Sequence, residues 1–230
     1  MHERYAARRA AFEASFRTAS PDEATRRRYT SPSGNFSLDT AEYAVPSSNW
    51  RYSRGVVSAV NDEVVIADVH RNYLQFWHTW AHHANGREYL LCGEDYQGQT
   101  IVDLTRRRTT TYFPDAGFSG AGFCWVAAYP SPDCTLLAID GCYWACPYEI
   151  VVVDFREPES LPYAEIARFP GAWEWKGWID SATLEYVVSV DVRKTDNVPY
   201  DSLPETEQAQ LDQDWRLIET VHQLRRFTIP

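Results

Sequence analysis

The sequence predicts an all-β protein, built from repeated four-stranded antiparallel meanders, with a helical arm at its N-terminus. Of its 230 residues, 44% are hydrophobic and 14% aromatic, with only 11 Gly and 13 Pro, which excludes collagen-like and disordered classes. From Phe36 onward, short runs of Val, Ile, Thr and aromatic residues alternate with turn residues, as is typical of strands. Phe113, Phe169 and Phe227 close three successive units at a nearly constant spacing, which indicates an internal repeat.

Residues 1–28 are predicted to form the helical arm. Tyr5, Phe12 and Phe16 fall on one face of a helix with 3.6 residues per turn. The segment carries seven arginines against four acidic residues, whereas the whole chain has a net charge of -10. We therefore expect two parts, the arm at 1–28 and a single β domain at 29–230.

A second short helix is expected within the arm. Ser20 is a suitable N-cap, Pro21 suits the first helical position, and Glu23 completes a capping box. The arginines at 26–28 suit a helix C-terminus, because they complement its dipole.

The β domain divides into three similar units at about 76–114, 123–170 and 173–230, with 35–74 as an irregular fourth unit. Such units resemble the blades of a β-propeller, with closure left open, and a β-sandwich of similar meanders is the alternative. The last unit contains a polar excursion at 192–214, in which we expect a short helix around 204–213 followed by a strand.

The repeat predicts which connections share an edge. In an antiparallel meander, alternate connections lie at the same end of the sheet. The tight turns at 84–87, 130–133 and 180–183 therefore share one rim. The loops GEDYQG (93–98) and DGCYWACPY (140–148) share the other rim with 192–214. Functional loops gather at one end of a rigid scaffold, so we expect the site at this second rim.

The loop 140–149 has two candidate chemistries besides a metal site, which is considered below, and one purely structural interpretation. Tyr143, Trp144 and Tyr148 would wall a ligand pocket. Cys142 or Cys146 would act as a nucleophile if a nearby base or cation formed the thiolate. The third interpretation is a plug that folds back over the sheet and buries its aromatic rings and thiols.

Carboxylates at the same rim are candidates for acid–base work. Glu94 and Asp140 each follow the second strand of their unit, and Glu149 opens the next strand. Paired carboxylates divide acid and base roles when their surroundings separate their pKa values. Asp95 and Tyr96 are candidate ligand contacts, although GEDYQG is also an ordinary turn by composition.

No metal or cofactor is predicted. Cys142 and Cys146 have a spacing that zinc permits, but a structural zinc site needs four ligands and no second pair supports it. His78 and His82 stand too far apart on a strand to bind one ion, and the motifs of nucleotide-binding loops are absent.

The charge balance restricts the partners. An acidic chain disfavours nucleic acid, and no apolar run is long enough for a membrane span. The run 195–214 holds six carboxylates without Lys or Arg, which predicts a loop that borders the site and attracts a basic partner. Five cysteines and no export signal predict a cytoplasmic protein.

Three functions fit these observations. The first is an intracellular binding protein that captures a small molecule or a basic partner at the second rim. The second is a small-molecule hydrolase or lyase that uses the rim carboxylates or a rim cysteine. The third is an acidic protein that neutralises a basic toxin or enzyme.

Overall fold

The computed structural model describes residues 3–46, 49–62, 64–144 and 147–230. In these residues the N-terminal helix α1 (Glu3–Phe16) precedes four antiparallel sheets, here named A to D, in which the strands follow chain order. Sheet A contains β1 (Ser20–Thr30), β2 (Phe36–Ala44), β3 (Arg51–Ala59) and β4 (Val65–Arg71), and sheet B contains β5 (Thr79–His82), β6 (Glu88–Cys92), β7 (Gln99–Asp103) and β8 (Arg108–Tyr112). Sheet C contains β9 (Phe123–Pro130), β10 (Leu136–Tyr143), β11 (Glu149–Asp154) and β12 (Glu165–Pro170), and sheet D contains β13 (Ala172–Trp178), β14 (Thr183–Arg193) and β15 (Ile218–Thr228). The prediction of repeated antiparallel meanders with an N-terminal helix is confirmed.

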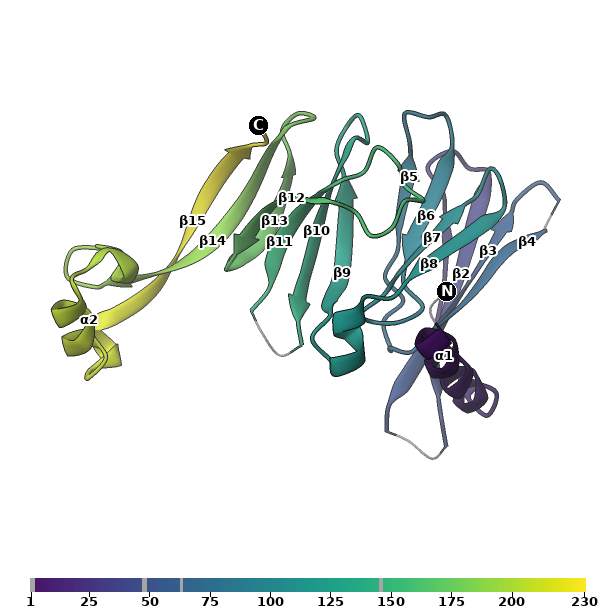
Figure 1. The fold of residues 1–230 in the computed structure, drawn as a ribbon, viewed down its shortest axis with the longest axis horizontal. Coiled ribbons are helices and arrows are strands. Elements are labelled where there is room, and N and C mark those ends of the chain that lie inside the picture. Colours follow the sequence, from purple (N-terminus) through teal and green to yellow (C-terminus); the bar gives the residue numbers. More distant parts are fainter. Residues whose placement is uncertain (1–2, 47–48, 63, 145–146) are drawn as a thin grey trace.

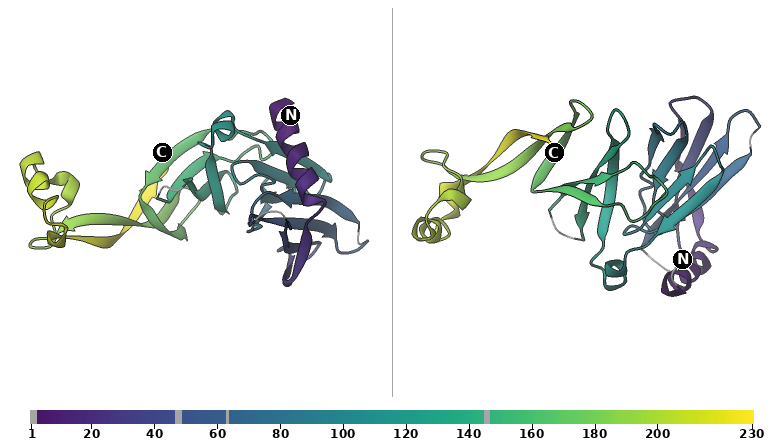
Figure 2. Two further views of the ribbon diagram at one scale, coloured as in Figure 1. Left: turned by 90° about the horizontal axis from the view of Figure 1, so that it is seen from below. Right: turned by 45° about the horizontal axis from the view of Figure 1, so that its top comes forward.

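The sheets follow one another along the long axis of the molecule, with sheets A and D at opposite ends (Figures 1 and 2). The part of the chain that the structure describes forms an open row and no closed barrel. Short helical segments lie between the strands: η1 (Asp115–Ser119), η2 (Tyr200–Ser202), α2 (Glu205–Leu211) and η3 (Trp215–Leu217).

Each sheet packs face to face on the next, because successive side chains of a strand point to opposite faces. In β6, Leu90 packs toward Leu38 and Val57 of sheet A, whereas Tyr89 and Leu91 pack toward sheet C. A third cluster joins sheets C and D. The inner strands are therefore buried on both faces, which explains their unbroken apolar runs. Each fully buried Leu or Val contributes about 1.5–3 kcal/mol.

Helix α1 lies across the ends of sheets A and B (Figure 1). Phe16 packs on Tyr43 of β2 and stacks on His70 of β4 at 4.0 Å between ring centroids. Tyr5 stacks on Phe113, just after β8, at 4.7 Å. The helix thus joins two neighbouring sheets.

The prediction of a second helix at 20–28 is wrong, because this segment forms most of β1. It pairs with β2 from Ser20 to Thr30, with a register shift between Asp22 and Arg27. A helix here would present no apolar face, since almost every residue of β1 is exposed or half-buried. A short helix without an apolar face does not recover its nucleation cost, whereas pairing satisfies the backbone along β2.

The observed order of the strands places the connections at the two edges that the repeat predicts. The connections after β6, β10 and β14 each follow the second strand of a meander, and they lie along the lower edge in Figure 1. The tight turns after β5, β9 and β13 lie along the upper edge. The short helix expected near 204–213 is present as α2, and the strand that follows it is β15.

Candidate functional site

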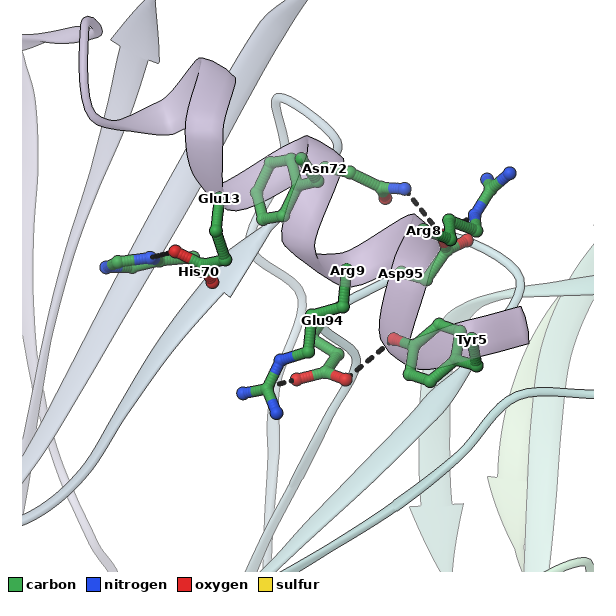
Figure 3. A pocket seen from close by; sticks show the side chains of 9 residues that line it. Tyr5, Arg8, Arg9, Glu13, His70, Asn72, Glu94 and Asp95 are labelled. Atoms are coloured by element: carbon green, nitrogen blue, oxygen red, sulfur yellow. Dashed lines mark hydrogen bonds and ion pairs between the residues drawn. The ribbon is translucent and has the colours of Figure 1, made fainter. Parts of the chain in front are cut away.

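The loop 93–98, which joins β6 to β7, is held beneath α1 (Figure 3). The hydroxyl of Tyr5 donates a 2.6 Å hydrogen bond to Oε1 of Glu94, and Nη2 of Arg9 lies 3.2 Å from Oε2 of the same carboxylate. Nε of Arg8 donates to Oδ2 of Asp95 at 2.9 Å. The two acidic residues that the sequence places at the rim are therefore partnered by the basic helix of the same chain.

The loop takes this shape for local reasons. The amide of Gln97 donates to the side chain of Asp95 at 3.0 Å, and the amide of Gly98 donates to the Asp95 carbonyl at 3.1 Å. These bonds make a tight turn of the kind that aspartate favours. A Cβ at Gly93 would lie 2.6 Å from the carbonyl oxygen of Gly98, so that position has no space for a side chain.

Burial determines the charge behaviour of Glu94. Its side chain is only 9% exposed, and burial raises the pKa of Glu94, while the hydrogen bond from Tyr5 and the charge of Arg9 act in the opposite direction. Glu94 also raises the pKa of Tyr5, after the larger effect of burial on that phenol. The small cavity beside these groups, lined also by Glu13, His70 and Asn72, has a volume of only about 10 Å³.

The segment that follows β4 connects this loop to a second cavity. Nδ2 of Asn72 donates to Asp95 at 2.6 Å, while Oδ1 of Asn72 accepts from the amide of Tyr96 at 2.9 Å. The indole Nε1 of Trp50 donates to the Asn72 carbonyl at 2.7 Å. Asn72 thus holds both the acidic end of the loop and the first aromatic rings of the cavity.

Arg71 lies beneath the same loop and is 3% exposed. Its Nε donates to the Gln75 carbonyl at 2.8 Å, and its Nη1 donates to the carbonyls of Gly93 at 2.6 Å and Asp95 at 3.1 Å. Burial lowers the pKa of Arg71 to about 10, so the guanidinium still carries its charge at neutral pH.

The second cavity, which we call the aromatic cavity, has a volume of about 100 Å³. Its lining comes from the segment after β4, from loop 93–98, from β9 and from the connection after β10, and comprises Arg71, Tyr73, Gln75, Trp77, Tyr96, Cys124, Trp125, Val126, Cys142, Trp144 and Tyr148.

Four rings form a mutually contacting group at this cavity: Trp50, Tyr73, Tyr96 and Trp144. All six pairs are in contact, with centroid separations from 5.5 Å for Tyr96–Trp144 to 6.5 Å for Tyr73–Trp144. Trp144 is 52% exposed and Trp50 39% exposed, so the group faces solvent on one side. Exposed rings in such an arrangement offer flat apolar faces to a ligand.

Deeper groups close the cavity. Trp77 and Trp125 are 5% and 7% exposed, with ring centroids 5.9 Å apart. Burial raises the pKa of the Cys124 thiol to about 11, so this cysteine stays protonated at neutral pH. The indole Nε1 of Trp77 is buried and has no hydrogen-bond partner among the described residues.

The structure brings together some of the predicted site residues. Tyr96, Cys142, Trp144 and Tyr148 line the aromatic cavity, whereas Glu94 and Asp95 lie under α1. Cys146 lies outside the described residues.

Three further candidates lie elsewhere on the same rim. Glu149 forms an ion pair with Arg168 at 3.0 Å, and Tyr143 packs on Phe123 at 5.3 Å between ring centroids, close to that same arginine. Asp140 is half-buried in β10, where burial raises its pKa. Among the described residues, no group of three His, Cys, Asp or Glu side chains is close enough to hold a metal ion.

The acidic run 195–214, which was expected to border the site, does not border the aromatic cavity. None of the residues that line the aromatic cavity comes from this run, and Figure 1 shows α2 beyond sheet D, at the opposite end of the molecule from sheet A. Several carboxylates of the run also form ion pairs with arginines that flank it in the sequence. Arg193 bonds Asp196 at 2.7 Å and also pairs with Glu207, and Arg216 bonds Asp214 at 2.8 Å.

Sequence reasoning missed seven of the eleven residues that line the aromatic cavity. Trp50, Arg71, Tyr73, Trp77 and Trp125 were not among its candidate site residues. Arg71 ends β4, and residues 72–78 form the connection between sheets A and B. This stretch combines amide and aromatic side chains without strand alternation. Clustered aromatic side chains also helped to single out loop 140–149, so they were an available signal here.

The fold and the cavity describe an all-β protein with an aromatic cavity between two stacked sheets. No family model matches the sequence. The chain is 32% identical over 142 residues to the uncharacterised protein R762 of Acanthamoeba polyphaga mimivirus. The match covers 60% of this chain and 55% of the viral protein, whose name states no activity. No helix in the described ranges is long and apolar enough to cross a membrane.

Proposed function

We propose that this protein binds a small molecule in the aromatic cavity. The observation that carries the proposal is the group of four rings, Trp50, Tyr73, Tyr96 and Trp144, in which all six pairs are in contact beside a cavity of about 100 Å³. Rings gathered from four separate segments, with one side exposed, suit a flat ligand face.

Two contacts favour a small ligand over a basic protein partner. Asp95 is already bonded by Arg8 and Glu94 by Arg9, so the acidic end of loop 93–98 is occupied within the chain. Ion pairs also argue against the hydrolase or lyase alternative. Glu94 is paired with Arg9, and Glu149 is paired with Arg168. Buried thiols at Cys92, Cys124 and Cys134 support an intracellular setting.

A propeller-like arrangement is part of the proposal. Face-to-face stacking of sheets A to D supports it, with the described sheets as an open arc of blades. The aromatic cavity would then lie between two neighbouring blades, at the rim with the longer loops.

Ligand-observed NMR with small planar compounds tests the binding proposal. Trp144→Ala removes one ring of the group from an exposed position, so it should abolish or strongly weaken binding without unfolding the protein. Trp215→Ala is the matched control, because Trp215 is 78% exposed, belongs to η3 just before β15, and is not among the residues that line the aromatic cavity. Hits that persist unchanged in Trp144→Ala would place the ligand elsewhere and overturn the proposal.

A further inference from the structure

The deep end of the aromatic cavity contains a hydrogen-bond donor without an acceptor. Trp77 is 5% exposed, lines the cavity, and its indole N–H has no partner among the described residues. A buried donor without a partner costs free energy, and most such groups in native proteins are satisfied. A bound molecule with an acceptor atom at this depth would satisfy it.

The lining of the same cavity also contains a buried positive charge, the guanidinium of Arg71. The hydrogen bonds of Arg71 described above go to the backbone carbonyls of Gln75, Gly93 and Asp95. Within the described ranges no carboxylate lies within ion-pair distance of its guanidinium, and the carboxylate of Asp95 is engaged by Arg8 and Asn72. A buried charge is stable when a counter-charge accompanies it, and here the chain supplies only carbonyl dipoles.

We infer that the ligand is a small planar molecule that carries a carboxylate. Its ring would stack on the group formed by Trp50, Tyr73, Tyr96 and Trp144, and its carboxylate would accept from Trp77 and face Arg71. A carboxylate only accepts hydrogen bonds, so it matches a cavity end that offers donors. A cationic ligand is disfavoured there by repulsion from Arg71 in a site of low dielectric. This inference rests on the proposed function, because it assigns the chemistry of the same cavity.

Three probes that share one ring separate the contributions. Benzoate carries the anion, toluene carries only the ring, and benzylammonium carries a cation. We expect benzoate to bind at least about tenfold more tightly than toluene, as a charge-assisted hydrogen bond allows, and benzylammonium to bind most weakly. Ligand-observed NMR titrations of the full chain measure all three affinities.

Two variants test the residues. Trp77→Phe keeps the ring and removes the N–H, so benzoate affinity should fall about fivefold to tenfold while toluene affinity changes little. Trp178→Phe is the matched control, because Trp178 is a partly buried indole that bonds Tyr129 at the interface of sheets C and D. Arg71→Gln should remove the preference for benzoate over toluene. Where Arg71→Gln fails to fold, by circular dichroism, the Trp77→Phe comparison decides alone.

The outcomes separate the two proposals. Equal binding of benzoate and toluene by the wild type, or tighter binding of benzylammonium, would overturn the carboxylate inference and leave the cavity as a binding site. Benzoate binding that is unchanged in Trp77→Phe would also overturn it. Failure of all three probes to bind would overturn the proposed function, and this inference with it.

Discussion

The phenol of Tyr5 donates a 2.6 Å hydrogen bond to the buried carboxylate of Glu94, which lies 89 positions further along the chain. This contact fastens α1 to the loop between β6 and β7. Asp95, Tyr96 and Asn72 continue the connection toward the aromatic cavity. Loop 93–98 therefore contacts the helix through its carboxylates and the cavity through Tyr96.

Tyr5→Phe should destabilise the protein. The substitution keeps the ring that stacks on Phe113 but leaves the Glu94 carboxylate without the phenol, a loss of about 1–3 kcal/mol for a buried charged acceptor. Urea unfolding followed by circular dichroism measures the change. Tyr29→Phe is the matched control, since Tyr29 is 39% exposed and its substitution should change the unfolding free energy by less than about 0.5 kcal/mol. Equal effects of the two substitutions would contradict the importance of the Tyr5–Glu94 bond.

Stability should depend on pH through Glu94. Burial raises its pKa above the ordinary value of 4.5, so the native state binds this proton more tightly than the unfolded chain. The resulting stabilisation is fully present below about pH 4.5 and is lost as pH rises through the raised pKa. Glu94→Gln lacks this titration, so the wild type should lose stability relative to Glu94→Gln as pH rises from about 4 to 8.

Unfolding curves of the wild type and Glu94→Gln at several pH values measure this difference. A change of the opposite sign would mean that Arg9 and Tyr5 outweigh burial in the native protein.

The thiols should differ in reactivity. Burial raises the pKa of Cys92 to about 12 and that of Cys124 to about 11, and both side chains are inside the fold. Since the thiolate is the reactive form, iodoacetamide should label both slowly under native, reducing conditions. Cys142, which is half-buried and lines the aromatic cavity, should be labelled faster.

Mass spectrometry of digests taken at successive times gives the labelling rates, with denatured protein as the reference in which all 5 cysteines react. Equal, slow labelling of Cys142 and Cys92 would show that the connection after β10 closes the cavity as a plug.

Neutralising the acidic run should leave ligand binding unchanged. Asp201→Asn with Glu205→Gln removes two exposed charges near α2, beyond sheet D and away from the aromatic cavity. At physiological ionic strength such charges are screened over about 8 Å. Affinity for the benzoate probe at physiological salt should therefore match the wild type. A weaker affinity of the variant at low salt alone would mean that the run attracts the ligand at long range, and a tighter one that it repels the ligand.

Local patterns were sufficient for most elements. The aromatic spacing of Tyr5, Phe12 and Phe16 predicts α1, and the repeat of short apolar runs predicts the meanders and their shared rims. The prediction of a helix at 20–28 was wrong, because a capping pattern does not reveal that this segment pairs with β2 as a strand. The sequence also indicated loop 140–149 as unusual, and Trp144 and Tyr148 do line the cavity.

The sequence by itself determined the features that follow from periodic patterns. These are the alternation of strand residues, the helical spacing of aromatic residues, and the loops that leave the same end of a meander. Only the tertiary structure decided that Glu94 and Asp95 face the chain's own arginines, while Trp50, Arg71 and Trp77 converge with Trp144. The physical reason is that alternation and helical spacing act over a few residues. Contacts between stacked sheets depend instead on how whole sheets pack and on where each connecting segment crosses between them.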